Sequence, residues 1–198
     1  MSANTQHQFP VLAELVAGSS FDRMAMKLLL VVAGSAALTL SAKTNVPFFP
    51  VPMTLQTLVV LLLGAAYGPR LAAATVLVYL AQGAAGLPVL AGTPERGIGL
   101  AYMVGPTGGF LAGFIIAAAL TGALARFGWT ASVGRATVTM TAGTVALYVP
   151  GLLWLGFFAD WDKALELGLM PFVYGDMLKL AVAAIAAPVT WHILHRIR

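Results

Sequence analysis

The chain has 198 residues, of which 60% are hydrophobic and 9% are charged, and its mean hydropathy is +0.89. A soluble domain carries about a quarter charged residues, so this composition excludes one and predicts an integral membrane protein. The absence of cysteine excludes disulfides and cysteine-based metal sites, and we interpret the net charge of +4 as a signal of membrane orientation rather than of nucleic-acid binding. We expect a single membrane domain over residues 1–198, with residues 1–22 as a polar cytoplasmic segment rather than a signal peptide.

Six apolar stretches follow one another along the chain and predict an all-α membrane protein with six transmembrane helices in one bundle. A perpendicular crossing of the bilayer needs about 20 residues. The second and third stretches have only 14 and 15 residues, so they either start below the surface or are completed by neighbouring loop residues. Within the helical region 24–195, the predicted stretches are 24–40, 54–67, 71–85, 107–125, 136–158 and 171–193.

The distribution of Lys and Arg predicts how these helices are oriented, because cytoplasmic loops collect basic residues. With the N-terminus inside, seven of the 11 basic residues fall on the cytoplasmic side, and both chain ends lie there. We therefore expect a multi-pass protein of the cell (inner, or cytoplasmic) membrane. The cytoplasmic set is Arg23, Lys27, Arg70, Arg126, Arg135, Arg196 and Arg198, whereas the outer loops hold Lys43, Arg96 and Lys163.

Two charged residues, Asp176 and Lys179, lie inside the last apolar stretch. At the centre of a membrane helix each costs roughly 2.5–3.5 kcal/mol, and such residues face the interior of a bundle or a wet cavity. Their spacing of three puts them on one helix face, where they can pair. They form either a ligand site or a structural pair that fixes helix packing. We favour the ligand site, because small residues fill a packing role at lower cost.

The connection SAKTNVPFFPVPMTLQT, residues 41–57, contains three prolines that prevent a helix. Irregular backbone at membrane depth is tolerated where it is buried in protein or lines a cavity. We therefore expect a re-entrant-like loop that folds inward, with Thr54 as the N-cap of the next helix and with Thr54 and Gln56 near a pocket. An ordinary surface loop is the alternative. Phe48 and Phe49 serve either as a lid or as interfacial anchors.

The third helix and the connection after it carry further polar candidates. Tyr79 and Gln82 share one helix face, and they form either interhelical hydrogen bonds or ligand contacts. The glycine-rich segment 86–110 is the longest irregular outer loop, and Arg96 is its only cation. Such a loop can close a pocket from outside and bring a positive charge to an anionic ligand group.

Small residues spaced four apart occur at two places. The motif GPTGGFLAG lacks the Lys of a phosphate-binding P-loop, and its Gly105, Gly109 and Gly113 instead have the spacing that lets membrane helices approach closely. Ala33 and Ala37 repeat in the same way on the first helix. They predict a flat stripe on which another helix packs, from this chain or from a partner.

Motifs for catalysis and nucleotide binding are missing from the sequence. It contains neither H-E-x-x-H nor G-x-S-x-G, and His192 and His195 have no acidic companion nearby. We therefore expect no enzyme, no ATPase activity of its own, no metal and no cofactor.

Four motifs, in their order and spacing, resemble the BioY family. They are VPMTLQTL after the first helix, AGLPVLAG in the third connection, GPTGGFLAGF at the start of the fourth helix and PFVYGDMLK at the start of the last. BioY proteins are the biotin-binding membrane subunits of energy-coupling factor transporters. The resemblance implies a substrate-binding subunit that works with a transmembrane coupling protein and ATP-binding subunits, with Ala33 and Ala37 on the docking surface.

The resemblance also implies roles for the polar residues. Asp176 would accept hydrogen bonds from the ureido N–H groups of biotin, and Lys179 would donate to the ureido oxygen, both as charge-assisted bonds. Arg96 is the candidate cation for the valerate carboxylate, with Lys43 in reserve. The rest of the ligand shell would comprise Thr54, Gln56, Tyr79, Gln82 and Tyr174, with Tyr148 and Trp154 as apolar walls.

Two alternatives to this reading stay open. One is a stand-alone secondary transporter of biotin or a similar small vitamin, in which Asp176 is the proton site. The other is a structural or assembly membrane protein, in which Asp176 and Lys179 only lock helices together.

Overall fold

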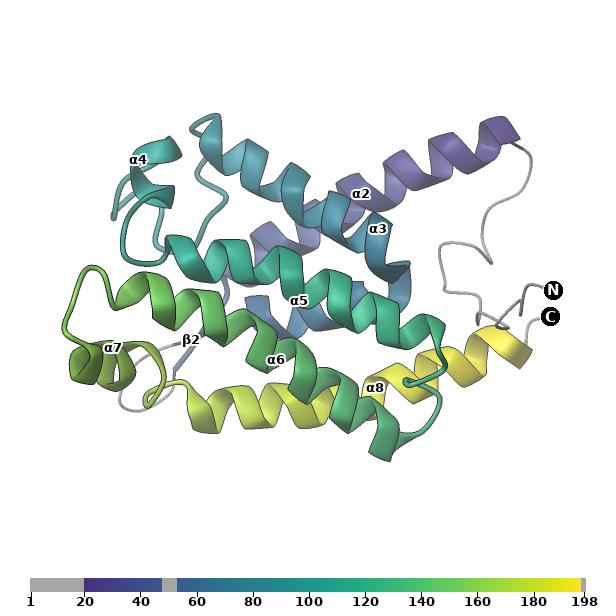
Figure 1. Ribbon diagram of the computed structural model, residues 1–198. Helices are drawn as coiled ribbons and strands as arrows, with labels where there is room; N and C mark the ends of the chain where they lie inside the picture. Colours follow the sequence, from purple (N-terminus) through teal and green to yellow (C-terminus); the bar gives the residue numbers. More distant parts are fainter. Residues whose placement is uncertain (1–19, 48–52, 197–198) are drawn as a thin grey trace, which may run out of the picture.

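A computed structural model describes residues 20–47 and 53–196 of the chain. Long helices run past one another, and a small antiparallel ribbon with two short helices lies at one end (Figure 1). In the ribbon, Asn45 pairs with Thr54 and Val46 with Met53. The elements are α2 (Ser20–Lys43), β1 (Asn45–Val46), β2 (Met53–Thr54), α3 (Gln56–Ala84), α4 (Gly99–Met103), α5 (Gly108–Arg126), α6 (Val133–Leu155), α7 (Trp161–Gly168) and α8 (Val173–Arg196).

The helix α3 is broken into two arms at Gly68. This residue has a φ of 76°, in the left-handed region that favours glycine, and Pro69 follows it without an N–H to continue the helix. Helix α5 packs tightly against the bend, because a Cβ on Gly122 would lie 2.5 Å from the Pro69 nitrogen. The stretches predicted as separate helices at 54–67 and 71–85 are the two arms of α3, which form the bend visible in Figure 1.

Glycines bring α5 and α6 close together, as their spacing predicts. A Cβ on Gly109 would lie 2.3 Å from the Pro150 carbonyl oxygen, and one on Gly113 would lie 2.5 Å from that of Leu147. Any larger residue would push the two helices apart. Gly105 lies before α5, in the turn after α4, so the packing prediction is confirmed for Gly109 and Gly113 only.

The main apolar cluster lies between α3 and its neighbours α5 and α2, and a smaller one lies between α3, α6 and α8. Val60, Val76 and Ala117 have no exposed surface, and Leu38 reaches this cluster from α2. Helix α2 is nevertheless peripheral. Only 22% of its membrane-spanning apolar segment is buried inside the protein, whereas 50% of the corresponding segment is buried in α3 and in α5. One side of α2 is therefore left without a partner within the described residues.

The helix connections gather at two opposite ends of the molecule (Figure 1). The start of α2, the bend of α3, the α5–α6 connection and the end of α8 lie at one end, and the ribbon, α4 and α7 lie at the other. Arg70 and Arg135 thus belong to the first end, and Arg96 and Lys163 belong to the second. These four residues are grouped as the sequence predicts, and the side of the membrane that each end faces stays a prediction.

Seven helices are present in the part of the chain that the structure describes. Four of them, α2, α3, α5 and α6, are long and apolar enough to cross a membrane, and α7 with α8 makes a fifth candidate span bent by 50°. The predicted count of six is reached only if the two arms of α3 are counted separately.

Two local predictions are wrong. The segment 86–110, expected to be an irregular loop, contains the short helix α4, and the connection 159–170, expected only as an outer loop, contains α7, in which Ala164 is buried and Leu165 and Glu166 are exposed. Thr54 does not cap α3, because it is the last residue of β2 and Leu55 occupies the cap position without a side-chain hydrogen bond.

Candidate functional site

A cavity of about 430 Å³ lies at the end of the molecule that holds the ribbon, between β2, α3, α5, α6, α7 and α8. It forms where the ribbon and the loop before α4 meet the ends of the long helices. Six of the nine residues predicted to bind a ligand line this cavity: Thr54, Gln56, Arg96, Tyr148, Asp176 and Lys179.

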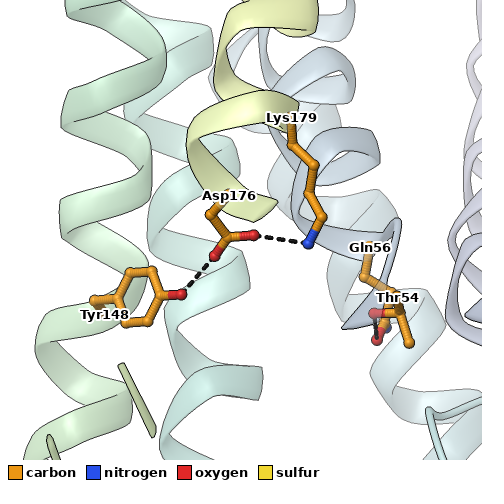
Figure 2. Close-up of polar contacts among 5 residues, drawn as sticks. All are labelled: Thr54, Gln56, Tyr148, Asp176 and Lys179. Carbon is orange, nitrogen blue, oxygen red and sulfur yellow. Dashed lines mark hydrogen bonds and ion pairs between the residues drawn. The ribbon is translucent and has the colours of Figure 1, made fainter. Parts of the chain in front are cut away.

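Asp176 and Lys179 form a buried ion pair in the cavity wall. The Lys179 Nζ lies 2.7 Å from Oδ1 of Asp176, and each side chain is only 8% exposed. The hydroxyl of Tyr148, from α6, donates to the other carboxylate oxygen, so Asp176 is engaged from two sides (Figure 2). Asp176 also lies in the first turn of α8, where the helix dipole stabilises negative charge.

The neighbours of this pair hold it in place. The ring of Phe110, from α5, meets the ring of Tyr148 edge to face, with centroids 5.9 Å apart. The strand β2 docks on the first turn of α8 through Met53, because a Cβ on Gly175 would lie 1.9 Å from the Met53 sulfur. Glycine next to Asp176 therefore lets the ribbon form one wall of the cavity.

Gln56 connects the cavity to a buried tyrosine behind it. Its side-chain amide donates to the Tyr79 hydroxyl at 2.8 Å, and that hydroxyl donates to the Val89 carbonyl at 3.0 Å. Thr54 donates weakly to the Gln56 side-chain oxygen, at 3.4 Å (Figure 2). Tyr79 is fully buried and supports Gln56 instead of lining the cavity itself.

Arg96 reaches the cavity from the loop that connects α3 to α4, residues 85–98, which we call the Arg96 loop. Its side chain crosses Gly92, whose φ is 72° and whose Cβ, if present, would lie 2.9 Å from the Arg96 Cδ. Among the described residues that line the cavity, Arg96 and Lys179 are the only cations, and Lys179 is already paired. Within the described residues no carboxylate pairs with Arg96.

Lys43, the reserve candidate for the ligand carboxylate, does not line the cavity. Its ammonium donates to the carbonyl and hydroxyl oxygens of Thr93 and to the Leu90 carbonyl. Lys43 therefore binds the backbone of the Arg96 loop.

Two more predicted polar contacts and one predicted wall lie away from the cavity. Gln82 accepts a hydrogen bond from Ser35 of α2 at 2.8 Å, which is the interhelical alternative for this residue. Tyr174 precedes Asp176 by two residues and points outward, with 73% of its surface exposed. The indole of Trp154 donates to the Gly105 carbonyl at 2.9 Å and closes the turn before α5.

Most of the cavity wall is apolar and was not identified from the sequence. Phe114 and Leu147 are buried beneath it, where α5 and α6 pack closely. On a buried helix, the hydrophobic pattern of the sequence is the same for residues that line a cavity and for residues of the core. The residues of the cavity wall can therefore be recognised only from the packing of the helices. The additional lining residues are Met53, Thr57, Ala91, Tyr102, Thr107, Phe110, Leu111, Phe114, Leu147, Leu167, Gly168 and Phe172.

The predicted docking stripe lies on the peripheral helix α2, where Ala33 is exposed and Ala37 is partly buried. The two phenylalanines predicted as a lid or as interfacial anchors, Phe48 and Phe49, lie outside the described residues.

The chemistry of the site is that of a binding pocket. A carboxylate and an ammonium group lie side by side with a tyrosine hydroxyl, and an arginine, aromatic rings and apolar side chains also line the cavity. Over residues 20–47 and 53–196, no three His, Asp or Glu side chains are grouped to hold a metal ion. The arrangement suits a small ligand with a polar head, an apolar body and an anionic tail.

Comparison with known proteins gives consistent matches. The chain is 38% identical over 155 residues to a protein of Pyrococcus horikoshii named as a probable biotin transporter BioY, covering 77% of this chain and 88% of that protein. It is also 38% identical over 158 residues to the biotin transporter BioY of Thermotoga maritima, with the same coverage of 77% and 88%.

A solved structure has the same fold. The crystal structure of the S-component for biotin from an ECF-type ABC transporter matches with a TM-score of 0.74 and 23% sequence identity, covering 88% of this chain and 95% of that one. The BioY family itself matches residues 10–196, nearly the full length of the sequence. The chain therefore belongs to the BioY family.

Proposed function

We propose that this chain is the substrate-binding membrane subunit of an energy-coupling factor transporter, and that it captures biotin with high affinity at the outer face of the cell membrane. The observation that carries the proposal is the position of the Asp176–Lys179 pair, which lines a cavity of about 430 Å³ instead of being sealed between helices. A pair that only locked helices together would have no need of an adjoining cavity. We assign biotin as the ligand because the relatives are named as biotin transporters.

The ureido ring of biotin fits the charged end of the cavity. Its two N–H groups can donate hydrogen bonds to the Asp176 carboxylate. Its carbonyl oxygen can accept a hydrogen bond from the Lys179 ammonium. Tyr148 holds the carboxylate in place, and the burial of the pair makes these charge-assisted bonds strong. Thr54 and Gln56 contribute polar groups on the ribbon side.

The other two parts of biotin fit the rest of the cavity. The apolar thiophane ring would lie against Phe110, Phe114 and Leu147. The valerate carboxylate would bind Arg96, the only cation of the lining that no carboxylate of the described chain neutralises. The proposal assigns no ligand contact to Gln82 or Tyr174, which lie away from the cavity.

Delivery of biotin to the cytoplasm requires a source of energy, and we propose that an ATP-driven coupling module supplies it. The sequence has no phosphate-binding loop of its own. The partly unburied helix α2, with Ala33 and Ala37, is the surface proposed for docking a transmembrane coupling protein, which works with ATP-binding subunits. We further propose six membrane passes, with both chain ends cytoplasmic and the cavity facing outward.

Equilibrium binding of labelled biotin to the purified, detergent-solubilised protein tests the ligand assignment. We expect Asp176→Asn and Lys179→Met each to weaken binding by about 2 kcal/mol or more, or about 30-fold, because each leaves a buried charged group without its partner. Asp160→Asn and Lys163→Met are matched controls, since these residues form a pair of the same spacing that is largely exposed. The controls should bind within about twofold of the wild type.

Two outcomes would count against the proposal. Biotin binding that survives both cavity substitutions would make the pair a structural ion pair. Failure of the well-folded wild type to bind biotin at all would refute the ligand assignment.

Uptake of labelled biotin into cells tests the coupling proposal separately. We expect uptake only when the coupling protein and the ATP-binding subunits are produced together with this chain. Uptake in their absence that an uncoupler abolishes would instead identify a stand-alone secondary transporter.

A further inference from the structure

Lys43, at the C-terminal end of α2, connects that helix to the Arg96 loop. Its Nζ lies 3.0 Å from the Leu90 carbonyl oxygen and 3.0 Å from the Thr93 hydroxyl oxygen, and it also donates to the Thr93 carbonyl. The two loop residues are almost fully buried, with exposures of 1% for Leu90 and 3% for Thr93. Lys43 therefore replaces water as the partner of these buried oxygens.

An ammonium group has three N–H donors, and at Lys43 three acceptors in the loop engage them. No donor is left for the ligand carboxylate. The position of the ammonium, away from the cavity lining, agrees with this count. Lys43 acts on the loop and not on the ligand.

Two tyrosines hold neighbouring parts of the same loop. The Tyr79 hydroxyl donates to the Val89 carbonyl at 3.0 Å, and the Tyr102 hydroxyl donates to the Ala91 carbonyl at 2.5 Å. The loop is thus fixed by side chains from α2, α3 and α4. Of these side chains only Lys43 comes from α2, and only Lys43 is charged.

The geometry of Arg96 depends on this part of the loop. The Arg96 N–H donates to the Gly92 carbonyl at 2.8 Å, and the Arg96 side chain lies directly over Gly92. Gly92 itself lies between Leu90 and Thr93, the two residues that Lys43 holds. A shift of this turn would therefore move the guanidinium group.

We infer that Lys43 is a positioning residue for ligand affinity: it clamps the Arg96 loop to the end of α2 and so holds Arg96 over the cavity for the carboxylate of the ligand. The inference rests on the proposed function for its ligand. The clamp itself rests on the three hydrogen bonds alone, and it can be measured without ligand.

Binding measurements with two ligands test the positioning role. We expect Lys43→Met to weaken biotin binding about tenfold, since three hydrogen bonds of a charged donor are lost, and to leave the binding of biotin amide, which has no carboxylate, nearly unchanged. Lys43→Arg keeps the charge and several donors and should recover part of the affinity. Lys27→Met removes a charge from the same helix at an exposed position and should bind like the wild type.

A double-mutant cycle separates positioning from direct contact. If Lys43 acts through Arg96, the double variant Lys43→Met with Arg96→Met binds biotin no more weakly than Arg96→Met alone. Losses that multiply, or an equal loss for biotin amide, would overturn the inference.

Hydrogen–deuterium exchange of the ligand-free protein tests the clamp independently. We expect faster exchange over residues 85–98 in Lys43→Met than in the wild type or in Lys27→Met, with α8 unchanged. Unchanged exchange in the loop would refute the clamp. If the wild type does not bind biotin, the proposed function fails, and the exchange result still decides whether Lys43 holds the loop.

Discussion

Two ion pairs of this protein have the same chemistry and the same spacing but very different surroundings. Asp176 and Lys179 are 2.7 Å apart and each 8% exposed, whereas Asp160 and Lys163 are 3.9 Å apart, with Lys163 66% and Asp160 87% exposed. In both pairs an acid precedes a lysine by three residues. The comparison shows that an i, i+3 spacing of charges does not by itself determine whether the pair is buried or lines a cavity.

The surroundings decide which pair is a candidate for binding. Water and salt screen the exposed pair, so the attraction between its charges is weak. At the buried pair a third residue, Tyr148, engages the carboxylate, and the charges face a cavity. A polar ligand that replaces water there meets charges that water does not screen.

The largest expected difference between the pairs is in stability. Asp176→Leu should lower the free energy of unfolding by about 3–5 kcal/mol, because it leaves the Lys179 ammonium buried and unpaired. The double variant Asp176→Leu with Lys179→Met should recover most of this loss, because a buried pair can be replaced by apolar residues of similar size. Thermal unfolding in detergent measures both effects.

The double variant separates folding from function. It should unfold near the wild-type temperature and yet bind no biotin. A double variant that binds biotin like the wild type would place the ligand elsewhere in the molecule.

A smaller effect is expected at the third member of the buried cluster. Tyr148→Phe removes the hydroxyl that donates to Asp176, and we expect it to weaken biotin binding by about 1.5 kcal/mol, or about tenfold. Tyr174→Phe is the matched control, because the Tyr174 side chain is 73% exposed and does not line the cavity. Equal losses in the two variants would show that Tyr174 also contacts the ligand, as the sequence predicts.

The smallest effect is expected at the exposed pair. Asp160→Asn should change the free energy of unfolding by less than about 0.5 kcal/mol, because the side chain lies in solvent. The same thermal unfolding assay applies. A large loss would mean that the two pairs are more alike than their exposure indicates.

Much of the fold could be predicted because hydrophobicity marks helices directly. The stretches predicted at 107–125 and 136–158 became α5 and α6 with boundaries shifted by a few residues. Helix α7 was missed because its eight residues include three charged ones, and its amphipathic pattern is too short to distinguish from a polar loop. The Gly68–Pro69 break was found only as a gap between two apolar stretches.

The charged part of the site was predictable for the same physical reason. Charged residues are rare in an apolar helix and face a bundle interior or a cavity, so the sequence predicted a site at Asp176 and Lys179. Both residues line the cavity of the structure. The partners of neutral polar residues were not predictable, since Gln82 turned toward Ser35 and Tyr79 toward Gln56. Such choices depend on how helices pack, and spacing along one helix does not show them.

A structure of the protein with bound biotin tests the central claim most directly. We predict that the ureido nitrogens lie within about 3 Å of the Asp176 carboxylate and that the ureido oxygen lies within the same distance of the Lys179 ammonium. Biotin bound elsewhere, with the Asp176–Lys179 pair untouched by the ligand, would contradict the claim and leave the pair a structural one.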